Sequence, residues 1–137
     1  MKIAKVAIRT LPSVSPPIPE GGGRIHSSTG ELAQITNGES FSFLAYIEFI
    51  LDAEKRRGNH YHETKTEILY IISGKLQAHY YDIDTGESMK VILQAGDLVA
   101  IEPRCAHAYV PLERSQAVEL SATAYDPADT LAYKLSE

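Results

Sequence analysis

Residues 57 to 67 read RGNHYHETKTE, a stretch that places two histidines one residue apart and a glutamate five residues after the second. In an extended strand, side chains alternate between the two faces of the sheet, so His60 and His62 lie on the same face. A strand does not need such a pair of imidazoles for its stability. We therefore interpret the stretch as part of a functional site, to which Glu67 at the head of the next apolar run returns a carboxylate.

On both sides of this stretch, the chain from Phe41 onward consists of short apolar runs rich in β-branched and aromatic residues, separated by breakers such as SGK, DTGE and AGD. Short strands at regular spacing predict an all-β sandwich or barrel. We expect a hairpin turn around residues 85–86 and one C-terminal helical turn capped by Asp126 or Asp129. The expected strand runs are FSFLAYIEFIL at 41–51, TEILYIIS at 66–73, KLQAHYYDI at 75–83, SMKVILQ at 88–94, DLVAIEP at 97–103, AHAYVPL at 106–112 and QAVELSATAY at 116–125.

The length of 137 residues suits one domain with a hydrophobic core. No apolar run reaches the ~18 to 20 residues that cross a bilayer, and the N-terminus lacks the apolar block of a signal peptide. We expect a soluble, cytoplasmic protein with no membrane contact. The formal net charge of -5 argues against a nucleic-acid surface, and the single cysteine, Cys105, excludes an intramolecular disulfide.

The opening part of the chain differs from the rest in composition. Residues 11–23 hold four prolines and three glycines, which remove hydrogen-bond donors and loosen the backbone, so we expect an arm or loop there. We divide the chain into an N-terminal arm and loop, residues 1–30, and a β domain, residues 31–137. Such an arm can wrap a second subunit, and a partner can cover the exposed edges of open sheets, so we expect a homodimer.

A fourth candidate ligand lies in GDLVAIEPRCAHAYV, residues 96–110, where His107 follows a Gly-Asp turn and a strand. Three neutral imidazoles and one carboxylate suit a divalent ion such as Zn, Fe, Mn, Ni or Co. We therefore expect one divalent metal ion, zinc first, with iron, manganese or nickel as alternatives. Its predicted ligands are His60, His62, Glu67 and His107.

The spacing of the first group resembles the first cupin motif. The pattern His60-x-His62, four residues, Glu67, six residues and Gly74 agrees with that motif, and Gly58 stands shortly before the histidines. The resemblance implies a single-domain cupin β-barrel, a double-stranded β-helix or jelly roll, with an extended N-terminal arm.

The segment from Gly96 to His107 resembles the second cupin motif. Glu102 and Arg104 stand where the family has a proline and a glycine, and Pro111 replaces its closing asparagine. These departures concern turn geometry more than ligation. His107 therefore remains a predicted ligand.

Two longer stretches resemble sugar-modifying cupins. RRGNHYHETKTEILYIISGK, residues 56–75, is similar to the C-terminal cupin domain of bifunctional UDP-acetamido-dideoxy-hexulose epimerase/reductases of capsular polysaccharide synthesis, and ATAYDPADTLAY, residues 122–133, is similar to the end of that domain. RRGNHYH also resembles the nucleotide-sugar ketoisomerases. These resemblances imply an epimerase or isomerase that acts on a nucleotide-linked keto sugar by metal-assisted proton transfer next to a carbonyl.

Proton transfer of this kind needs an acid or base of suitable pKa. Tyr109 shares the face of His107 by alternation, so we favour it. His79 and Glu119 lie in strand runs that can line the barrel and are further catalytic candidates. Tyr61 alternates away from the ligand face, so we expect it to be packed.

We expect the substrate to be bound by residues close in sequence to the predicted metal ligands. A carrier diphosphate is recognised by guanidinium groups, so Arg56, Arg57 and Arg104 are the candidates. Tyr80 is a further candidate for substrate contact.

Two other classes of function fit the same ligands. Metal-dependent dioxygenases use three histidines and one glutamate to hold iron or nickel with open positions for substrate and O₂. A non-catalytic module would hold a small molecule in the mouth of the barrel. No helix-turn-helix pattern accompanies the strands, so we do not expect a transcription factor.

Overall fold

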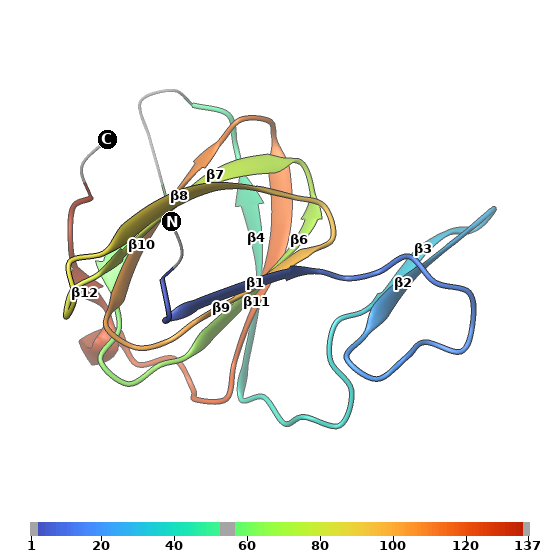
Figure 1. The fold of residues 1–137 in the computed structure, drawn as a ribbon, viewed down its shortest axis with the longest axis horizontal. Coiled ribbons are helices and arrows are strands. Elements are labelled where there is room, and N and C mark those ends of the chain that lie inside the picture. Colours follow the sequence, from blue (N-terminus) through green and yellow to red (C-terminus); the bar gives the residue numbers. More distant parts are fainter. Residues whose placement is uncertain (1–2, 53–56, 136–137) are drawn as a thin grey trace.

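A computed structural model describes residues 3–52 and 57–135. Two five-stranded antiparallel sheets enclose a β-barrel, and a two-stranded hairpin projects from it (Figure 1). This architecture confirms the predicted all-β jelly roll. Sheet 1 contains, in spatial order, β1 (Val6–Thr10), β9 (Asp97–Ile101), β6 (Glu67–Ser73), β11 (Ser115–Ser121) and β4 (Phe43–Phe49). Sheet 2 contains β12 (Leu131–Ala132), β5 (Arg57–Tyr61), β10 (Cys105–Pro111), β7 (Lys75–Asp82) and β8 (Ser88–Gln94).

The hydrophobic core lies between the two sheets. Leu69 and Ile71 of β6 are buried, as are Leu76, Ala78 and Tyr80 of β7, and all five belong to one apolar cluster. Their spacing of two residues is the alternation expected of strands with one buried face. Full burial of an aliphatic side chain stabilises a fold by roughly 1.5 to 3 kcal/mol, so this cluster fixes which face of each strand points inward.

The segment expected to form an arm, residues 1–30, contains two strands and the first residue of a third. β1 pairs with β9 along its whole length, and its Val6 side chain is buried in the core. β2 (Gly23–Ser27) and β3 (Gly30–Gln34) form the hairpin that projects from the barrel (Figure 1). The start of the segment therefore belongs to the barrel, because an apolar residue there completes the core, while the boundary at residue 30 stays a prediction.

The turns follow the sequence signals. Gly86 has φ +78° in the β7–β8 turn, as expected for a hairpin there. A short 3-10 helix, η1 (Pro127–Asp129), begins after Asp126, whose carboxylate accepts a hydrogen bond from the Ala128 N–H. Within the described residues, no helix has the length and apolarity that a membrane crossing requires.

Candidate metal centre

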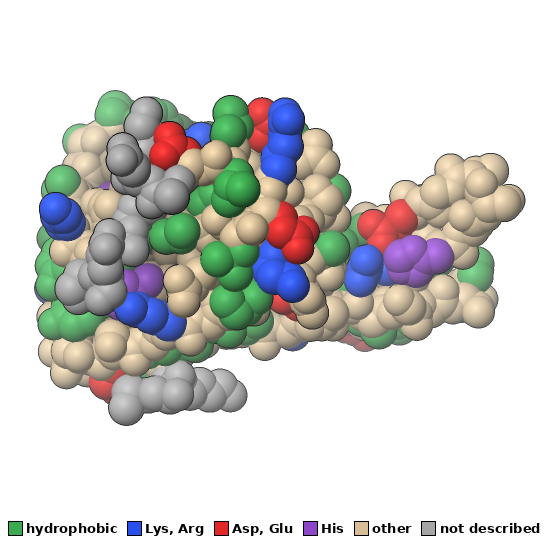
Figure 2. All heavy atoms as spheres, turned by 90° about the horizontal axis from the view of Figure 1, so that it is seen from above, with side chains coloured by type: hydrophobic (Ala, Val, Ile, Leu, Met, Phe, Trp, Pro, Cys, Tyr) green, Lys and Arg blue, Asp and Glu red, His purple; other side chains and the backbone are tan. Residues whose placement is uncertain are grey.

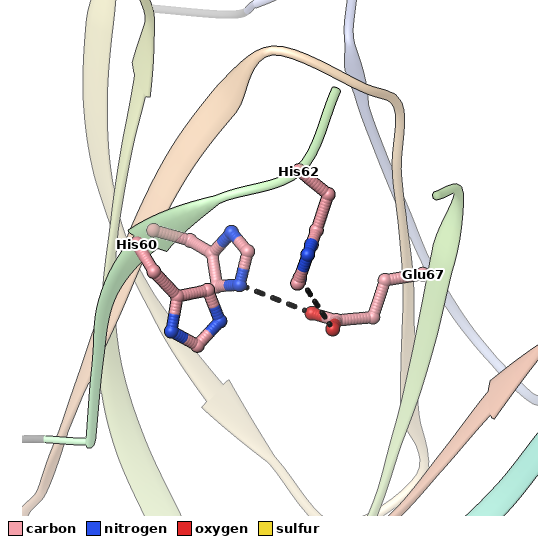
Figure 3. A group of neighbouring side chains, drawn as sticks. His60, His62 and Glu67 are labelled. Carbon is pink, nitrogen blue, oxygen red and sulfur yellow. Dashed lines mark ion pairs between the residues drawn. The ribbon is translucent and has the colours of Figure 1, made fainter. Parts of the chain in front are cut away.

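The structure brings together the four predicted ligands inside the barrel. Their ligating atoms all lie within 4.8 Å of one another. Figure 3 shows His60, His62 and Glu67 converging from β5, the segment after it, and the start of β6. His107 joins them from β10, where it pairs with His60. Three of the four side chains are buried, and His60 is half-buried.

A β-bulge in β5 shapes this site. The pairing between β5 and β10 shifts next to the His107–His60 pair, and Asn59, with φ +58°, is the extra residue. Gly58 has φ +105°, and a Cβ there would lie 2.6 Å from the His107 carbonyl oxygen. Arg57 and His60 are three positions apart, so in a regular strand their side chains would lie on opposite faces. Because the bulge adds one residue between them, both side chains face the same cavity.

Main-chain carbonyl groups orient two of the imidazoles. Nδ1 of His62 lies 2.7 Å from the carbonyl oxygen of Asp129, and Nδ1 of His107 lies 3.1 Å from that of Cys105. A carbonyl only accepts, so each Nδ1 donates, and Nε2 of the neutral ring carries the lone pair. These Nε2 atoms lie 3.5 and 3.2 Å from the two oxygens of Glu67. Two such lone pairs facing a carboxylate require either a cation or protons between them.

The donor set fits a divalent ion. Nε2 of His62 is buried and has no hydrogen-bond partner among the described residues. A buried polar atom without a partner is costly, and a metal ion is one partner that satisfies an imidazole nitrogen. Three imidazoles and a carboxylate form a ligand set that divalent transition metals accept. The four side chains could therefore hold such an ion.

The electrostatics of the cluster favour the ligand form of His60 and Glu67, whereas His107 without an ion is drawn towards protonation by Glu67. Burial, followed by the neighbouring His107, lowers the pKa of His60 to about 4, so this ring is neutral near pH 7. Burial alone would raise the pKa of Glu67, but His107, His62 and Lys65 together hold it well below its usual range. In turn, Glu67 raises the pKa of His107 against the effect of burial. The carboxylate is therefore ionised, as metal binding requires.

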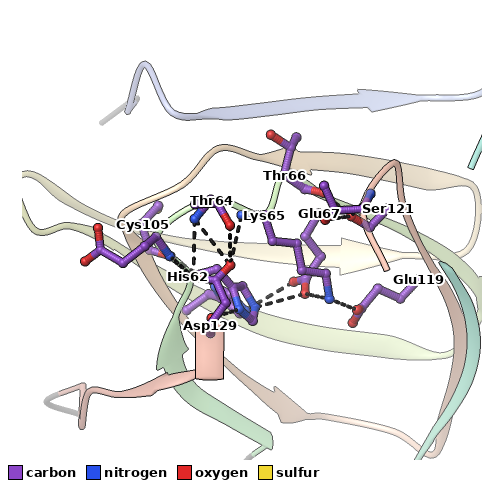
Figure 4. Close-up of polar contacts among 12 residues, drawn as sticks. His62, Thr64, Lys65, Thr66, Glu67, Cys105, Glu119, Ser121 and Asp129 are labelled. Atoms are coloured by element: carbon purple, nitrogen blue, oxygen red, sulfur yellow. Dashed lines mark hydrogen bonds and ion pairs between the residues drawn. The ribbon is translucent and has the colours of Figure 1, made fainter. Parts of the chain in front are cut away.

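The sequence analysis missed Lys65, which lies beside the cluster. Its Nζ is 2.8 Å from Glu119 Oε2 and 3.5 Å from Glu67 Oε1 (Figure 4), and it lies 4.6 Å from the ring centre of Phe43. Burial, then the charge of Glu67, raises the pKa of Glu119 although Lys65 opposes the shift. Lys65 lies in the loop between β5, which ends at Tyr61, and β6, which begins at Glu67, so strand alternation gave no signal for it.

A cavity of about 110 Å³ adjoins the cluster. Three of the predicted catalytic or substrate-binding residues line it, Arg57, Tyr109 and Glu119. The guanidinium of Arg57 lies 5.7 Å from the ring centre of Phe49. Burial, followed by Tyr80, raises the pKa of Tyr109 well above its usual value, so the phenol stays protonated and is not available as a phenolate base near pH 7.

The other candidates lie elsewhere. Tyr80 is fully buried behind Tyr109 and meets it through their hydroxyl oxygens, 3.2 Å apart. His79 lies on the opposite face of β7, because neighbouring side chains alternate and Tyr80 points inward. Arg104 is on the surface, ion-paired with two acidic side chains. Arg56 lies outside the described residues.

Comparisons with known proteins agree with this fold. The family model of the cupin domain matches residues 47–121. Among solved structures, the chain resembles QdtA, a sugar 3,4-ketoisomerase from Thermoanaerobacterium thermosaccharolyticum in complex with TDP, with a TM-score of 0.75 and 18% identity over 95% of this chain and 89% of that one. No curated protein matches the sequence significantly.

Two further solved structures are similar. WlaRB, a TDP-quinovose 3,4-ketoisomerase from Campylobacter jejuni, has a TM-score of 0.73 and 18% identity over 94% of this chain and 93% of that one. ChmJ, a 3'-monoepimerase from Streptomyces bikiniensis in complex with dTDP-quinovose, has a TM-score of 0.75 and 15% identity over 95% of this chain and 70% of that one. At these identities the likeness concerns the fold.

Proposed function

The chain belongs to the cupin family, and we propose that it is an enzyme that isomerises or epimerises a nucleotide-linked keto sugar with the help of a bound divalent metal ion. The observation that carries the proposal is a cluster of three imidazoles and a carboxylate that opens onto a cavity lined by Tyr109 and Glu119. The likeness to the folds of two 3,4-ketoisomerases and a monoepimerase supports the same class of reaction.

In this proposal, the ion is held by His60, His62, Glu67 and His107. A bound divalent ion polarises a carbonyl or holds an adjacent hydroxyl, which offsets several kcal/mol of developing charge. The chain itself contributes two imidazoles that its main-chain carbonyl groups hold with Nε2 facing the site, and an ionised carboxylate between them.

The reaction requires a base and an acid on the cavity wall. The base removes the proton from the carbon next to the ketone, and the C–H electron pair forms the C=C bond of an enediolate while the carbonyl oxygen takes the charge. For isomerisation, the hydroxyl on the carbon that lost its proton passes its own proton to the former carbonyl oxygen, and the C–H proton returns to the former carbonyl carbon, so that ketone and hydroxyl exchange places. For epimerisation, the proton returns to the same carbon from the opposite face and the ketone is restored. Glu119, whose carboxyl pKa is raised by burial, is our candidate base, and Tyr109 is our candidate acid.

The cavity accommodates only part of such a substrate. Its volume of about 110 Å³ is well below the ~300 to 1,000 Å³ of pockets that bury a drug-sized ligand. We therefore place the sugar inside and the diphosphate outside, against Arg57, whose guanidinium can bind phosphate oxygens in bidentate fashion. Arg56 remains a candidate for the same role.

We also propose that the protein is a homodimer. On the outer face of sheet 1, Leu44, Tyr46 and Ile72 are 68%, 56% and 36% exposed, and Leu32 of the hairpin is 57% exposed. Figure 2 shows hydrophobic side chains gathered in a band on the surface of the barrel. Exposed apolar patches of this kind often mark protein interfaces. Light scattering at micromolar concentration tests this proposal, since a monomer would contradict it.

The first test of function is elemental analysis of protein purified without chelator or a metal column. We expect about one equivalent of metal per chain in the wild type, because four ligands converge on one point, and none in the His60→Ala/His107→Ala double variant. Zinc or manganese would support the proposed chemistry. Iron together with oxygen uptake would instead indicate a dioxygenase.

The second test follows exchange of substrate hydrogen with solvent. A TDP-linked 4-keto sugar is incubated with the enzyme in D₂O and observed by proton NMR. We expect deuterium at the carbon next to the ketone in the wild type and none in the double variant. Tight binding without exchange would contradict an enzymatic role and favour a binding module.

A further inference from the structure

The carboxylate of Asp129, in η1, binds the segment that carries His62. It accepts hydrogen bonds from the main-chain N–H groups of Glu63 at 2.7 Å, Thr64 at 3.3 Å and Lys65 at 3.2 Å, and from the Thr64 hydroxyl at 2.8 Å. Figure 4 shows Asp129 meeting Thr64 and Lys65 beside His62. One side chain therefore fixes three consecutive peptide groups next to a candidate ligand.

The main chain of the same residue acts on the imidazole itself. The carbonyl oxygen of Asp129 lies 2.7 Å from Nδ1 of His62. A carbonyl has no proton to give, so this contact requires the proton on Nδ1 and leaves the Nε2 lone pair directed at Glu67. The carboxylate and the carbonyl are parts of one residue, so the contacts of the carboxylate also hold the carbonyl in place.

The surroundings of His62 explain why the ring needs such a contact. A cavity of about 140 Å³ borders the imidazole on the side of the C-terminal segment, lined by His62, Thr64, Thr123, Asp126, Asp129 and Thr130. This is more than the share of liquid volume that one water occupies, roughly 30 Å³. A ring next to such a space is not confined by packing alone, so its orientation depends on its hydrogen bond.

We propose that Asp129 is the positioning residue of His62: its carboxylate anchors residues 63–65, and its carbonyl oxygen selects the imidazole tautomer that can bind a metal ion. The consequence for metal affinity rests on the proposed function, whereas the consequence for the tautomer does not. Hydrogen bonds from the outer side of a ligand typically change metal affinity about 10- to 100-fold.

The test compares Asp129→Ala with Asp126→Ala. Asp126 is the matched control because its carboxylate caps the same turn, accepting from the Ala128 N–H at 2.9 Å, and within the described residues it makes no hydrogen bond to residues 63–65. The first measurement is the ¹⁵N NMR spectrum of the imidazoles in metal-free protein at about pH 8, where an unperturbed imidazole is neutral. The His62 signals are assigned by their absence from His62→Gln.

We expect the Nδ1–H tautomer at His62 in the wild type and in Asp126→Ala, and a mixture of tautomers in Asp129→Ala. The second measurement is the dissociation constant for Co²⁺ or Zn²⁺. We expect it to rise about 10- to 100-fold in Asp129→Ala and to stay near the wild-type value in Asp126→Ala. Asp129→Asn retains one acceptor oxygen and should fall between the two, which keeps the comparison available if Asp129→Ala does not fold.

Three outcomes have different meanings. An unchanged His62 tautomer in folded Asp129→Ala or, failing that, Asp129→Asn would overturn the proposal. A mixture of His62 tautomers in Asp126→Ala would also overturn the proposal, because the intact turn, rather than the Asp129 carboxylate, would then set the tautomer. If the wild type binds neither metal, the proposed metal site fails, while the tautomer measurement still decides whether Asp129 positions His62.

Discussion

On one side of the cluster, His107 belongs to β10, a strand paired on both sides, and its Nδ1 is bound by Cys105 of the same strand. On the other side, His62 follows the end of β5, and its Nδ1 is bound by Asp129, 67 residues later in the chain. We call residues 105–111 the β10 wall and residues 62–65 the His62 loop. The wall is part of the core, whereas the loop is held by a few polar contacts, so mutations in the two should differ in their effect on stability.

Replacing His107 and His62 in turn should give the largest difference between the β10 wall and the His62 loop, because both variants lose metal but only one should lose much stability. Both His107→Ala and His62→Ala should lower metal content at least about tenfold, because each removes one of four ligands. His107→Ala should also lower the free energy of unfolding of the metal-free protein by about 3 kcal/mol, since it removes the nearest of three partners of the buried Glu67 carboxylate, at 3.2 Å. His62→Ala should cost only about 1 kcal/mol, because its ring borders a cavity.

Elemental analysis and urea unfolding measure the two quantities. His79→Ala, on the outer face of β7, is the control for metal content and should retain it. Stoichiometric metal in His62→Ala would show that the predicted ligands are wrong. Equal losses of stability in the two variants would remove the distinction between wall and loop.

Tyr109→Phe tests the wall for catalysis rather than for ligation. The variant removes only a hydroxyl whose partner is Tyr80, so metal content should not change. We expect the exchange rate to fall about 100-fold, in the range reported for loss of a general acid. Tyr80→Phe is the matched control, because it removes the same hydrogen bond and keeps the Tyr109 hydroxyl. Similar rates in the two variants would show that Tyr109 is not the acid.

Gly58→Ala tests the contact between β5 and the wall. We expect a loss of about 2 kcal/mol in the free energy of unfolding, because φ is +105° and the new Cβ would lie 2.6 Å from the His107 carbonyl oxygen. Gly86→Ala is the control, with φ +78° but its nearest neighbouring atom 3.8 Å away, and it should cost about 1 kcal/mol. Urea unfolding measures both, and equal losses would mean that the close approach is unimportant.

The smallest expected effect concerns Asp82, on β7 opposite the start of the wall. Burial would raise the pKa of Asp82, but hydrogen bonds from Lys5, Asp84 and Thr85 lower it below its usual value. Because the folded pKa is below the unfolded one, the unfolded chain binds more protons in acid. The stabilisation is therefore complete above the unfolded pKa and is lost as pH falls through the folded value.

Asp82→Asn should lower the free energy of unfolding by about 1 kcal/mol at pH 7, and the difference from the wild type should shrink below about pH 4. Thermal unfolding across this range measures it. Over the same pH range, the carbonyl group of Cys105 does not titrate, so its hydrogen bond with Nδ1 of His107 in the wall should not change. A difference that stays constant down to pH 3 would show that the Asp82 charge does not contribute.

The strands could be predicted from sequence wherever alternation or apolar runs marked a buried face. Tyr61 is an example. It stands between His60 and His62, so alternation predicted that it points away from the ligand face, and it packs against Tyr133 on the outside of sheet 2. The strands of the N-terminal segment were missed. Prolines and glycines are frequent in residues 11–23, and among the described strands β2 and β3 pair with each other and with neither sheet of the barrel.

The candidate site was predictable in part for the same reason. The spacing of His60, His62 and Glu67 is a local property, and alternation carries it directly into space. The role suggested for Asp129 had no such signal, because sequence alone does not say which distant carbonyl a ring will meet. His79 and Tyr80 illustrate a further limit, since two adjacent residues cannot both face the cavity in a regular strand.

The sequence by itself determined the fold class, because strand alternation acts over a few neighbouring residues, and it indicated the four candidate ligands, His107 by a motif resemblance rather than by a local pattern. Only the tertiary structure decided that a bulge at Asn59 turns Arg57 into the same cavity as His60, and that Asp129 rather than a neighbour orients His62. Both depend on contacts between segments about 50 to 70 residues apart, whose relative placement is fixed by packing of the whole barrel and not by any local pattern.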